Sequence, residues 1–203
     1  LGIPNLDLPA RPQPAVIYPK FTIEGDRNPN TRGARACGVA PGPQGLPLRE
    51  MMAAAAEGRI RALVFLRGGP PELFGDATVT ARALERAELV LVSDLFPSAV
   101  SERAHWILPG TSFAEKDGTF TNSLGRVQRI RKVLTIRGDT REEWRILQGL
   151  GRALGVLPAV DPTPEAVFAR LAREVPAFAG LSYATIGDLG APLAAETADL
   201  AVG

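Results

Sequence analysis

The chain has 203 residues, of which 45% are hydrophobic, a size and composition typical of one globular domain with an apolar core. Its 23 basic and 22 acidic residues leave a formal net charge of +1 and are interspersed, which gives no basic surface of the kind that binds nucleic acid or an anionic membrane. Cys37 is the only cysteine, which excludes an intrachain disulfide, a C-x-x-C motif and a self-contained iron–sulfur or cysteine-type zinc site.

The sequence lacks the signals of membrane and secretory proteins. Its apolar stretches are far shorter than a transmembrane span, and no basic start precedes an apolar core. We therefore expect a soluble protein in a reducing compartment. The chain begins with Leu1 rather than Met, inside a proline-rich segment, so we expect a fragment of a longer polypeptide.

Residues 1–47 are rich in proline and glycine. Proline fixes φ and removes a backbone donor, so this segment is expected to be extended and to wrap around the rest, without long helices. Residues 16–18 and 21–23 are candidates for short edge strands, because Pro19 between them is excluded from a central strand.

A β-α-β unit is predicted next. Two apolar runs without alternation, residues 62–66 and 89–92, indicate adjacent parallel strands that are buried on both faces in the interior of a sheet. Asp76 can cap a helix between them, near residues 76–86. The connection is expected to be right-handed.

Further elements flank this unit. Before it, residues 48–57 predict a helix whose apolar face is made by Leu48, Met51, Met52 and Ala55. Gly58 is a natural stop for that helix. After the unit, residues 98–104 predict a short helix and residues 105–108 a third strand.

Residues 118–133 predict a two-stranded antiparallel ribbon. Gly118 opens a run of β-forming residues, and Asn122 and Gly125 occupy the first and fourth positions of a type I turn. Arg126 then starts a returning strand. Local chemistry alone describes a surface hairpin, in which a positive φ at Gly125 would make a valine there destabilising.

Two helices and a tail are predicted after the ribbon. Thr140 and Glu143 form a capping box for a helix that ends at Gly155 and whose shared face holds Trp144, Leu147, Gly151 and Leu154. Thr163 caps a second helix, which has Pro164 in its first turn and Pro176 as its stop. Residues from about 180 onward are expected to be a docked or frayed tail.

The residues of the hairpin resemble a sequence signature of a known protein family. The matching residues are Glu115, Gly118, Thr119, Phe120, Thr121, Asn122, Gly125, Arg126 and Gln128. Leu108 and Pro109 precede them in the chain. They resemble the E-x-x-G-T-F-x-N-x-E-G-R-x-Q signature of the molybdopterin-oxidoreductase-like family. Within that family, the order of the later elements is similar to the C-terminal part of the large iron–sulfur subunit of respiratory NADH:quinone oxidoreductase, complex I. The resemblance covers roughly residues 30–180, and it includes a glycine-rich run at residues 30–42 that otherwise predicts an irregular loop.

The resemblance implies a fold of the α/β class. It predicts a parallel-sheet molybdopterin-oxidoreductase-like domain with a β-hairpin and C-terminal helices. The expected parts are an extended Pro/Gly-rich wrapping segment at residues 1–47, the α/β domain at 48–180 with the hairpin at 118–133 and helices near 140–154 and 163–175, and a tail at 181–203.

In this family, loops at the carboxyl ends of the strands hold the nucleotide end of the cofactor. The usual G-x-N-P loop is replaced here by Arg67, Gly68, Gly69 and Pro70, whereas Asp94 fits the V-x-D-x-F pattern. Gly68, Gly69 and Asp94 are therefore candidates for a vestigial nucleotide loop, and Arg67 could hold a phosphate by charge. Two carboxylates of the family pattern are missing as well, because His105 and Leu124 stand in their places.

Four other residues are candidates for chemistry. His105 has neither a nucleophile motif around it nor an adjacent carboxylate, so a structural or surface role is expected rather than that of a general base. Glu115 and Asp117 are more simply explained as turn contacts than as an acid/base pair. Cys37 is expected to be a small buried residue rather than a reactive thiol.

The first interpretation is a scaffolding, cofactor-free portion of the complex I iron–sulfur subunit, which as a whole passes electrons from NADH towards quinone. Iron–sulfur clusters are expected in the N-terminal part of that subunit, and no metal, redox centre or catalytic residue is expected here. The expected partners are that N-terminal part and other peripheral-arm subunits, without nucleic acid or direct membrane insertion. The expected location is cytoplasmic, peripheral to the inner face of the plasma membrane.

Two alternatives stay open. One is a fragment of a true molybdopterin-dependent oxidoreductase such as a formate dehydrogenase, which would need the full cofactor-binding apparatus. The other is a free-standing nucleotide-binding module. That module would need a glycine-rich phosphate loop at a helix start, and the prolines at positions 70 and 71 argue against one.

Overall fold

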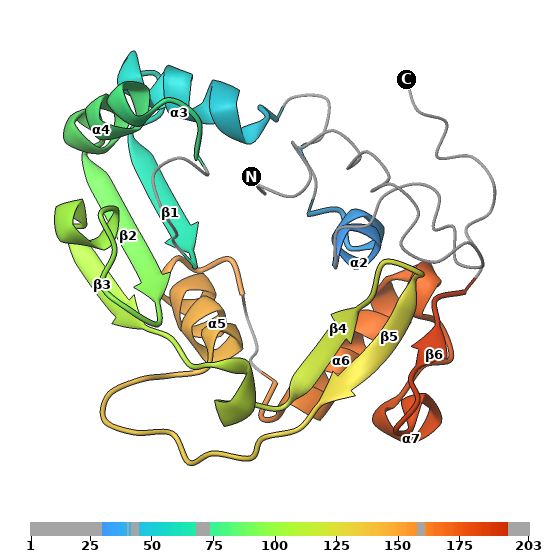
Figure 1. The fold of residues 1–203 in the computed structure, drawn as a ribbon. Coiled ribbons are helices and arrows are strands. Elements are labelled where there is room, and N and C mark those ends of the chain that lie inside the picture. The colour runs from blue at the N-terminus through green and yellow to red at the C-terminus, as the bar shows by residue number, and fades with distance from the viewer. Residues whose placement is uncertain (1–29, 40, 42–44, 68–73, 158–160, 195–203) are drawn as a thin grey trace, which may run out of the picture. The chain divides into compact units, whose positions relative to one another are not determined.

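The computed structural model describes residues 30–39, 41, 45–67, 74–157 and 161–194. They divide into two compact units (Figure 1). Unit 1 holds the described residues of 41–117 and 131–161, and unit 2 holds those of 30–39, 118–130 and 162–194. The chain therefore passes from one unit to the other and back. The edge strands predicted at residues 16–18 and 21–23 lie outside the described residues.

Unit 1 contains a three-stranded parallel sheet in the order β1–β2–β3 (Figure 1). The strands are β1 (Ala62–Leu66), β2 (Leu89–Asp94) and β3 (Trp106–Pro109). Helix α4 (Ala77–Arg86) connects β1 to β2, and the Asp76 carboxylate caps it by accepting from the N–H groups of Thr78 and Val79 at 2.8 and 3.0 Å. The β-α-β unit and the third strand are thus confirmed.

The core of unit 1 lies between the sheet and the helices α3 (Leu48–Ala56) and α4. Met52 and Ala55 of α3 are fully buried, as are Val90 and Val92 of β2. These side chains bring together the apolar face predicted for residues 48–57 and one face of the sheet. Burial of such residues is the main favourable term for this unit.

The prediction that β1 lies in the sheet interior with both faces buried is wrong. Among the described strands β1 is at the edge, and burial alternates along it, with Leu63 and Phe65 buried and Val64 54% exposed. On β3, Trp106 is 66% exposed. An unbroken apolar run shows that a strand is suited to burial on both faces, but the described residues cover much of only one face of this sheet.

Two 3₁₀ helices flank β3 in unit 1. The first, η2 (Ser101–Arg103), is shorter than the helix predicted for residues 98–104. The second, η3 (Phe113–Glu115), follows β3 and leads towards the hairpin.

Helix α5 (Glu143–Ala153) differs from its prediction in two respects. The capping box is wrong, because the N-cap is Glu142 without a side-chain cap, and the Thr140 hydroxyl donates instead to the carbonyl of Arg137 at 2.7 Å. The face that Trp144, Leu147, Gly151 and Leu154 share is not a buried one, because Leu147 and Leu154 are exposed. The sequence pattern locates the helix but not the side by which it packs.

Unit 2 contains a three-stranded antiparallel sheet of β4 (Gly118–Thr121), β5 (Arg126–Ile130) and β6 (Ala191–Pro192). The predicted turn is confirmed: the Gly125 N–H donates to the Asn122 carbonyl at 3.0 Å, and Gly125 has a φ of 77°. The ribbon is shorter than predicted and has a third strand, because β5 ends at Ile130 and pairs with β6 on its other edge.

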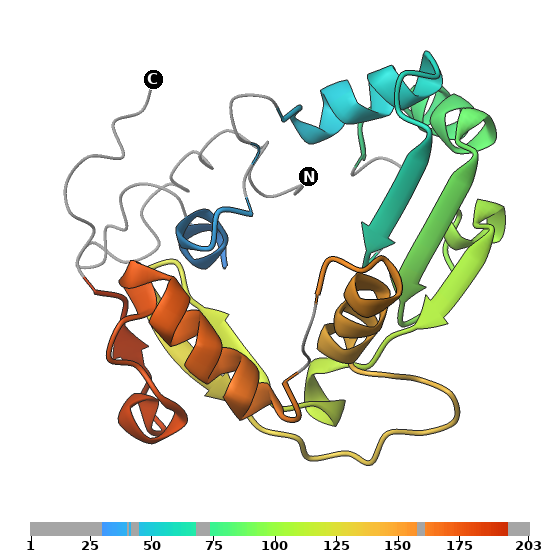
Figure 2. The ribbon, with the colours of Figure 1, turned by 180° about the vertical axis from the view of Figure 1, so that it is seen from behind.

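Among the described residues, this sheet is accompanied by the helices α2 (Thr31–Ala36), α6 (Pro164–Glu174), η4 (Pro176–Phe178) and α7 (Tyr183–Ile186). Figure 2 shows α6 running across one face of the β4–β5 hairpin. Thr163 caps α6 by accepting from the Ala166 N–H at 3.1 Å, as predicted. The buried core of unit 2 consists of Val127, Phe168, Phe178, Tyr183 and Ile186. Residues 31–36 are therefore helical rather than irregular, and residues 183 and 186 are docked.

Candidate functional site

The carboxyl ends of β1, β2 and β3 meet at one edge of the parallel sheet in unit 1, which is where such sheets bind ligands. Five polar residues gather at this edge, and we call them the Glu143 cluster: Arg67, Ser93, Thr111, Lys116 and Glu143. Arg67 and Thr111 come shortly after the ends of β1 and β3, and Ser93 is the penultimate residue of β2. Lys116 follows η3, and Glu143 is the first residue of α5.

The centre of the cluster is the Glu143 carboxylate. Its Oε1 accepts a hydrogen bond from Nη2 of Arg67 at 2.5 Å, and its Oε2 accepts one from Nζ of Lys116. Both cations also donate to the carbonyl of Thr111, at 2.5 and 3.2 Å respectively. The side chains of Glu143 and Lys116 are 15% and 16% exposed and that of Arg67 is 39% exposed. Removing Glu143 would therefore leave the Lys116 ammonium group in a poorly hydrated position, whereas Arg67 is exposed.

Arg67 has an unusual backbone. Its φ is 64°, in the left-handed region, which costs a residue other than glycine about 1–2 kcal/mol. Its N–H donates to the Ser93 carbonyl at 2.7 Å, next to the last pair of the β1–β2 ladder. The surrounding contacts offset this strain, and strain of this kind is concentrated at functional sites.

Two hydroxyl groups in the cluster are fully buried. Neither Ser93 nor Thr111 has a hydrogen-bond partner for its hydroxyl among the described residues, which costs about 1–3 kcal/mol for each group. A Cβ on Gly110 would lie 2.9 Å from Oε1 of Glu143 and 3.2 Å from Oγ of Ser93. Glycine at position 110 thus allows the carboxylate to approach the strand end.

The structure places Asp94 outside the cluster. Its Oδ1 accepts from the Leu95 N–H at 2.8 Å, and as the neighbour of Ser93 on β2 it points to the other face of the sheet. Gly68 and Gly69, the other two predicted nucleotide-loop residues, lie outside the described residues. Arg67, considered from the sequence as a holder of phosphate, binds a carboxylate of this chain.

His105 and Glu115 make structural contacts. Nδ1 of His105 accepts from the Val90 N–H at 2.9 Å, and the His105 N–H donates to the Val90 carbonyl at 2.8 Å, so the residue links β3 to β2. The Ser112 N–H donates to the Glu115 carboxylate at 2.9 Å, and this hydrogen bond lowers the pKa of Glu115 below its usual value.

Cys37 and Asp117 also lie apart from the cluster. Cys37 is exposed at the end of α2, so the prediction that it is buried is wrong, although partial burial of its thiol raises the pKa of Cys37. Oδ1 of Asp117 accepts from the Lys132 N–H at 3.4 Å. Within the described ranges, no three His, Cys, Asp or Glu side chains come together as metal ligands, and no helix has the length and apolar character to cross a bilayer.

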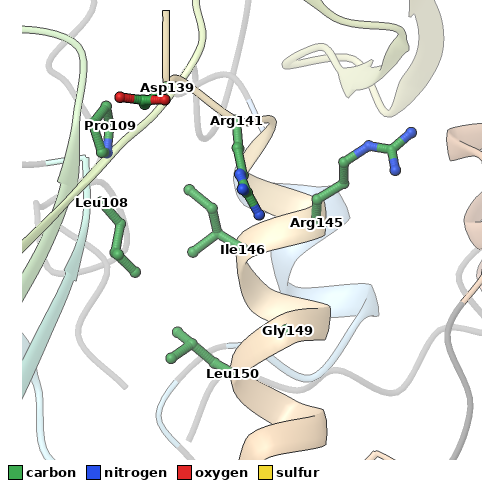
Figure 3. A pocket seen from close by; sticks show the side chains of 8 residues that line it. All are labelled: Leu108, Pro109, Asp139, Arg141, Arg145, Ile146, Gly149 and Leu150. Carbon is green, nitrogen blue, oxygen red and sulfur yellow. The ribbon is translucent and has the colours of Figure 1, made fainter.

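A pocket of about 250 Å³ lies between β3 and α5 in unit 1 (Figure 3). Leu108, Ile146 and Leu150 provide its apolar lining. Figure 3 shows Ile146 and Leu150 on the side of α5 that faces Leu108, while Arg145 extends away from the gap. The volume lies below the range of about 300–1,000 Å³ that is usual for small-molecule sites.

Sequence reasoning missed most of the Glu143 cluster. The spacing of Glu143 from Thr140 suggests a capping box, and Lys116 stands out only as the residue between two acids. A weak signal exists in Ser93, a hydroxyl residue at the carboxyl end of an apolar strand, where ligand-binding groups of parallel sheets lie. The approach of Lys116 and Glu143 depends on the tertiary fold and has no local signature.

Comparison with known proteins was consistent with this architecture. The chain is 35% identical over 156 residues to the NADPH-Fe(3+) oxidoreductase subunit alpha of Geobacter sulfurreducens, a match that covers 77% of this chain and 18% of the relative. It is 30% identical over 176 residues to a subunit of the NADH-quinone oxidoreductase of Rhizobium meliloti, with 86% and 20% covered. It is 29% identical over 175 residues to formate dehydrogenase H of Escherichia coli, with 85% and 24% covered.

The chain therefore spans about a quarter or less of the length of these relatives. The molybdopterin oxidoreductase family model matches residues 31–153, which is more than half of the chain. These residues include the β-α-β unit, the hairpin and the whole Glu143 cluster. The chain belongs to the molybdopterin oxidoreductase family.

Proposed function

We propose that the chain is a scaffolding, cofactor-free portion of the large iron–sulfur subunit of an NADH:quinone oxidoreductase, complex I. The similarity to the NADH-quinone oxidoreductase subunit of Rhizobium meliloti over 86% of the chain supports this branch of the family. The subunit as a whole would pass electrons from NADH towards quinone. Its iron–sulfur clusters would lie in a part of the subunit outside this chain, and this portion would contribute no catalytic residue.

The observation that carries the proposal is that Glu143 pairs with both Arg67 and Lys116 at the carboxyl ends of the strands of the parallel sheet. A pterin nucleotide at this edge would bring phosphate groups, which need free cations or N–H donors. Arg67 and Lys116 already bind Glu143, and that carboxylate would repel a phosphate beside it. The described residues therefore do not fit the nucleotide as they stand.

The proposed role also needs surfaces for partners. Val64 and Trp106 leave apolar side chains exposed on the sheet of unit 1, and exposed apolar surface is typical of contacts with further protein. We propose that the partners are the N-terminal part of the same subunit and other subunits of the peripheral arm. The complex would then lie at the cytoplasmic face of the plasma membrane, without insertion of this portion into it.

A second candidate is a portion of a molybdopterin-dependent formate dehydrogenase. The 32% identity over 144 residues to the F420-dependent formate dehydrogenase 1 subunit alpha of Methanococcus maripaludis favours it to a similar degree. Asp94 matches the V-x-D-x-F pattern of the family, which is compatible with this candidate. The cofactor content of the full-length protein distinguishes the complex I proposal from the formate dehydrogenase candidate.

The test uses the full-length polypeptide that contains this segment, purified from its natural source and desalted. Molybdenum, tungsten and iron are measured by elemental analysis, and oxidised pterin is measured by its fluorescence after denaturation. The proposal predicts iron without stoichiometric molybdenum, tungsten or pterin, and co-purification with further oxidoreductase subunits. Stoichiometric molybdenum or tungsten with pterin would overturn it in favour of the formate dehydrogenase candidate.

A further inference from the structure

The pocket between β3 and α5 has an apolar interior and a polar end. Leu108, Ile146 and Leu150 line the interior. Figure 3 shows Asp139 and Arg141 at one end of the gap and Leu150 at the other. The volume of about 250 Å³ holds roughly eight groups of the size of a water molecule. The pocket is thus suited to a small ligand with an apolar body and a polar head.

The polar end carries one charge of each sign. Asp139 and Arg141 are exposed, and neither side chain has an ion-pair or hydrogen-bond partner among the residues that the structure describes. Arg145, another cation that lines the pocket, donates from Nε to the Glu142 carboxylate at 2.9 Å. The Arg141 N–H donates to the Pro109 carbonyl at 2.9 Å, which fixes this end of the pocket to β3. A carboxylate and a guanidinium at one mouth match a ligand that carries both an ammonium and a carboxylate group.

Gly149 provides a second, independent observation. It lines the pocket from the middle of α5, where glycine is less favourable than alanine because its backbone loses more freedom. Packing does not require this glycine, because a Cβ at Gly149 would meet no described atom within 4 Å. By contrast, a Cβ at Gly151 on the same helix would lie 3.0 Å from Cβ of Leu157. Glycine at position 149 therefore leaves open a part of the pocket that a side chain would fill.

We propose that this pocket binds a free apolar α-amino acid of about the size of leucine. The side chain of the ligand would lie against Leu108, Ile146 and Leu150, its carboxylate would pair with Arg141, and its ammonium group would pair with Asp139. None of the residues that line the pocket is a member of the Glu143 cluster, so the site is independent of the proposed function. A bound amino acid would contact both β3 and α5 and would stabilise unit 1.

The test titrates L-leucine into the full 203-residue chain by isothermal titration calorimetry. We expect saturable binding at one site per chain, and Arg141→Gln and Asp139→Asn should each weaken it at least tenfold. Gly149→Leu should abolish binding without lowering the melting temperature, because leucine is favoured in helices and open space surrounds this position. The matched control is Arg152→Gln, which removes an exposed cation in the last turn of α5 outside the pocket and should leave the affinity unchanged.

Related ligands test each part of the assignment. Isocaproate lacks the ammonium group of leucine, isoamylamine lacks its carboxylate, and free glycine lacks its apolar side chain, so each should bind at least tenfold more weakly than leucine. Equal binding of N-acetyl-leucinamide, which carries neither charge, would overturn the proposal in favour of a leucine side chain from a partner protein. The proposal would also be overturned by a wild type that shows no saturable binding of leucine, by unchanged affinity in either charge variant, or by binding that survives Gly149→Leu.

Discussion

Two glycines in unit 2 provide a matched pair for separating backbone strain from steric overlap. Gly125 and Gly190 both have a φ of 77°, so alanine at either position meets the same conformational penalty. Their surroundings differ. A Cβ at Gly125 would have Nη1 of Arg32 as its nearest neighbour, at 3.4 Å, whereas a Cβ at Gly190 would lie 2.6 Å from the carbonyl oxygen of Val127 and 2.8 Å from Cγ of Gln128.

The expected costs follow from these distances. The left-handed conformation costs alanine about 1–2 kcal/mol, and the loss of glycine's freedom in the unfolded chain returns about 0.4–1 kcal/mol, so Gly125→Ala should destabilise by roughly 0.5–1 kcal/mol. Gly190→Ala adds an overlap with the backbone of β5, for which overpacking costs of about 1–3 kcal/mol are typical. The total for Gly190→Ala is therefore roughly 1.5–4 kcal/mol.

The measurement is hydrogen exchange of the β5 amides, read by mass spectrometry on peptides from residues 118–130. The opening free energy of β5 should fall by the amounts above in the two variants, while exchange in α4 of unit 1 stays unchanged as an internal control. Equal losses for Gly125→Ala and Gly190→Ala would show that the overlap at Gly190 is relieved by movement of β6 and would refute the steric argument. A cost near zero at both sites would refute the strain argument too.

Three further predictions concern single side chains. Met52→Ala should lower the free energy of unfolding by about 2–5 kcal/mol because Met52 is fully buried, whereas Trp106→Ala should change it by less than about 1 kcal/mol, and urea denaturation of both variants measures the contrast. The hydrogen bond from the Ser112 N–H lowers the pKa of Glu115 in the folded state, so the stabilisation by Glu115 is present above the unfolded pKa of about 4.3 and is lost as the pH falls through the folded pKa. The difference in unfolding free energy between the wild type and Glu115→Gln should therefore shrink as the pH falls below that range. A difference that stays constant with pH would contradict this role of Glu115. The pKa of Cys37 is raised by partial burial of its thiol, so its rate of alkylation by iodoacetamide should be slow at neutral pH and reach its half-maximal value above pH 9.0, and a midpoint below that value would contradict the effect of this partial burial.

Local patterns in the sequence were sufficient for most of the helices and strands. The spacing of Leu48, Met52 and Ala55 predicted α3, and the preference of aspartate for the N-cap position predicted that α4 begins after Asp76. The turn at Gly125 was predictable because a positive φ is a property of a few consecutive residues. All of these signals depend on neighbours within one or two turns of the chain.

What the sequence did not reveal depends on residues far apart. The exposure of Val64 follows from what covers the sheet, which an apolar run does not specify. Strand β6 has two residues and therefore no periodicity to detect. Glu143 fits the third position of a capping box by spacing alone, and only the fold shows that its carboxylate binds Arg67 instead of a backbone N–H.

The passage of the chain between the two units has a consequence for the order of folding during synthesis. The buried core of unit 1 comes from one continuous stretch, from Leu48 to Val100, so it can close soon after that stretch leaves the ribosome. The core of unit 2 joins Val127 to Ile186, about 60 residues later. At translation rates of about 5–20 residues per second, the apolar face of the hairpin waits roughly 3–12 s for the helices that cover it. During that interval the nascent hairpin, and not the finished protein, is the species that a chaperone would bind.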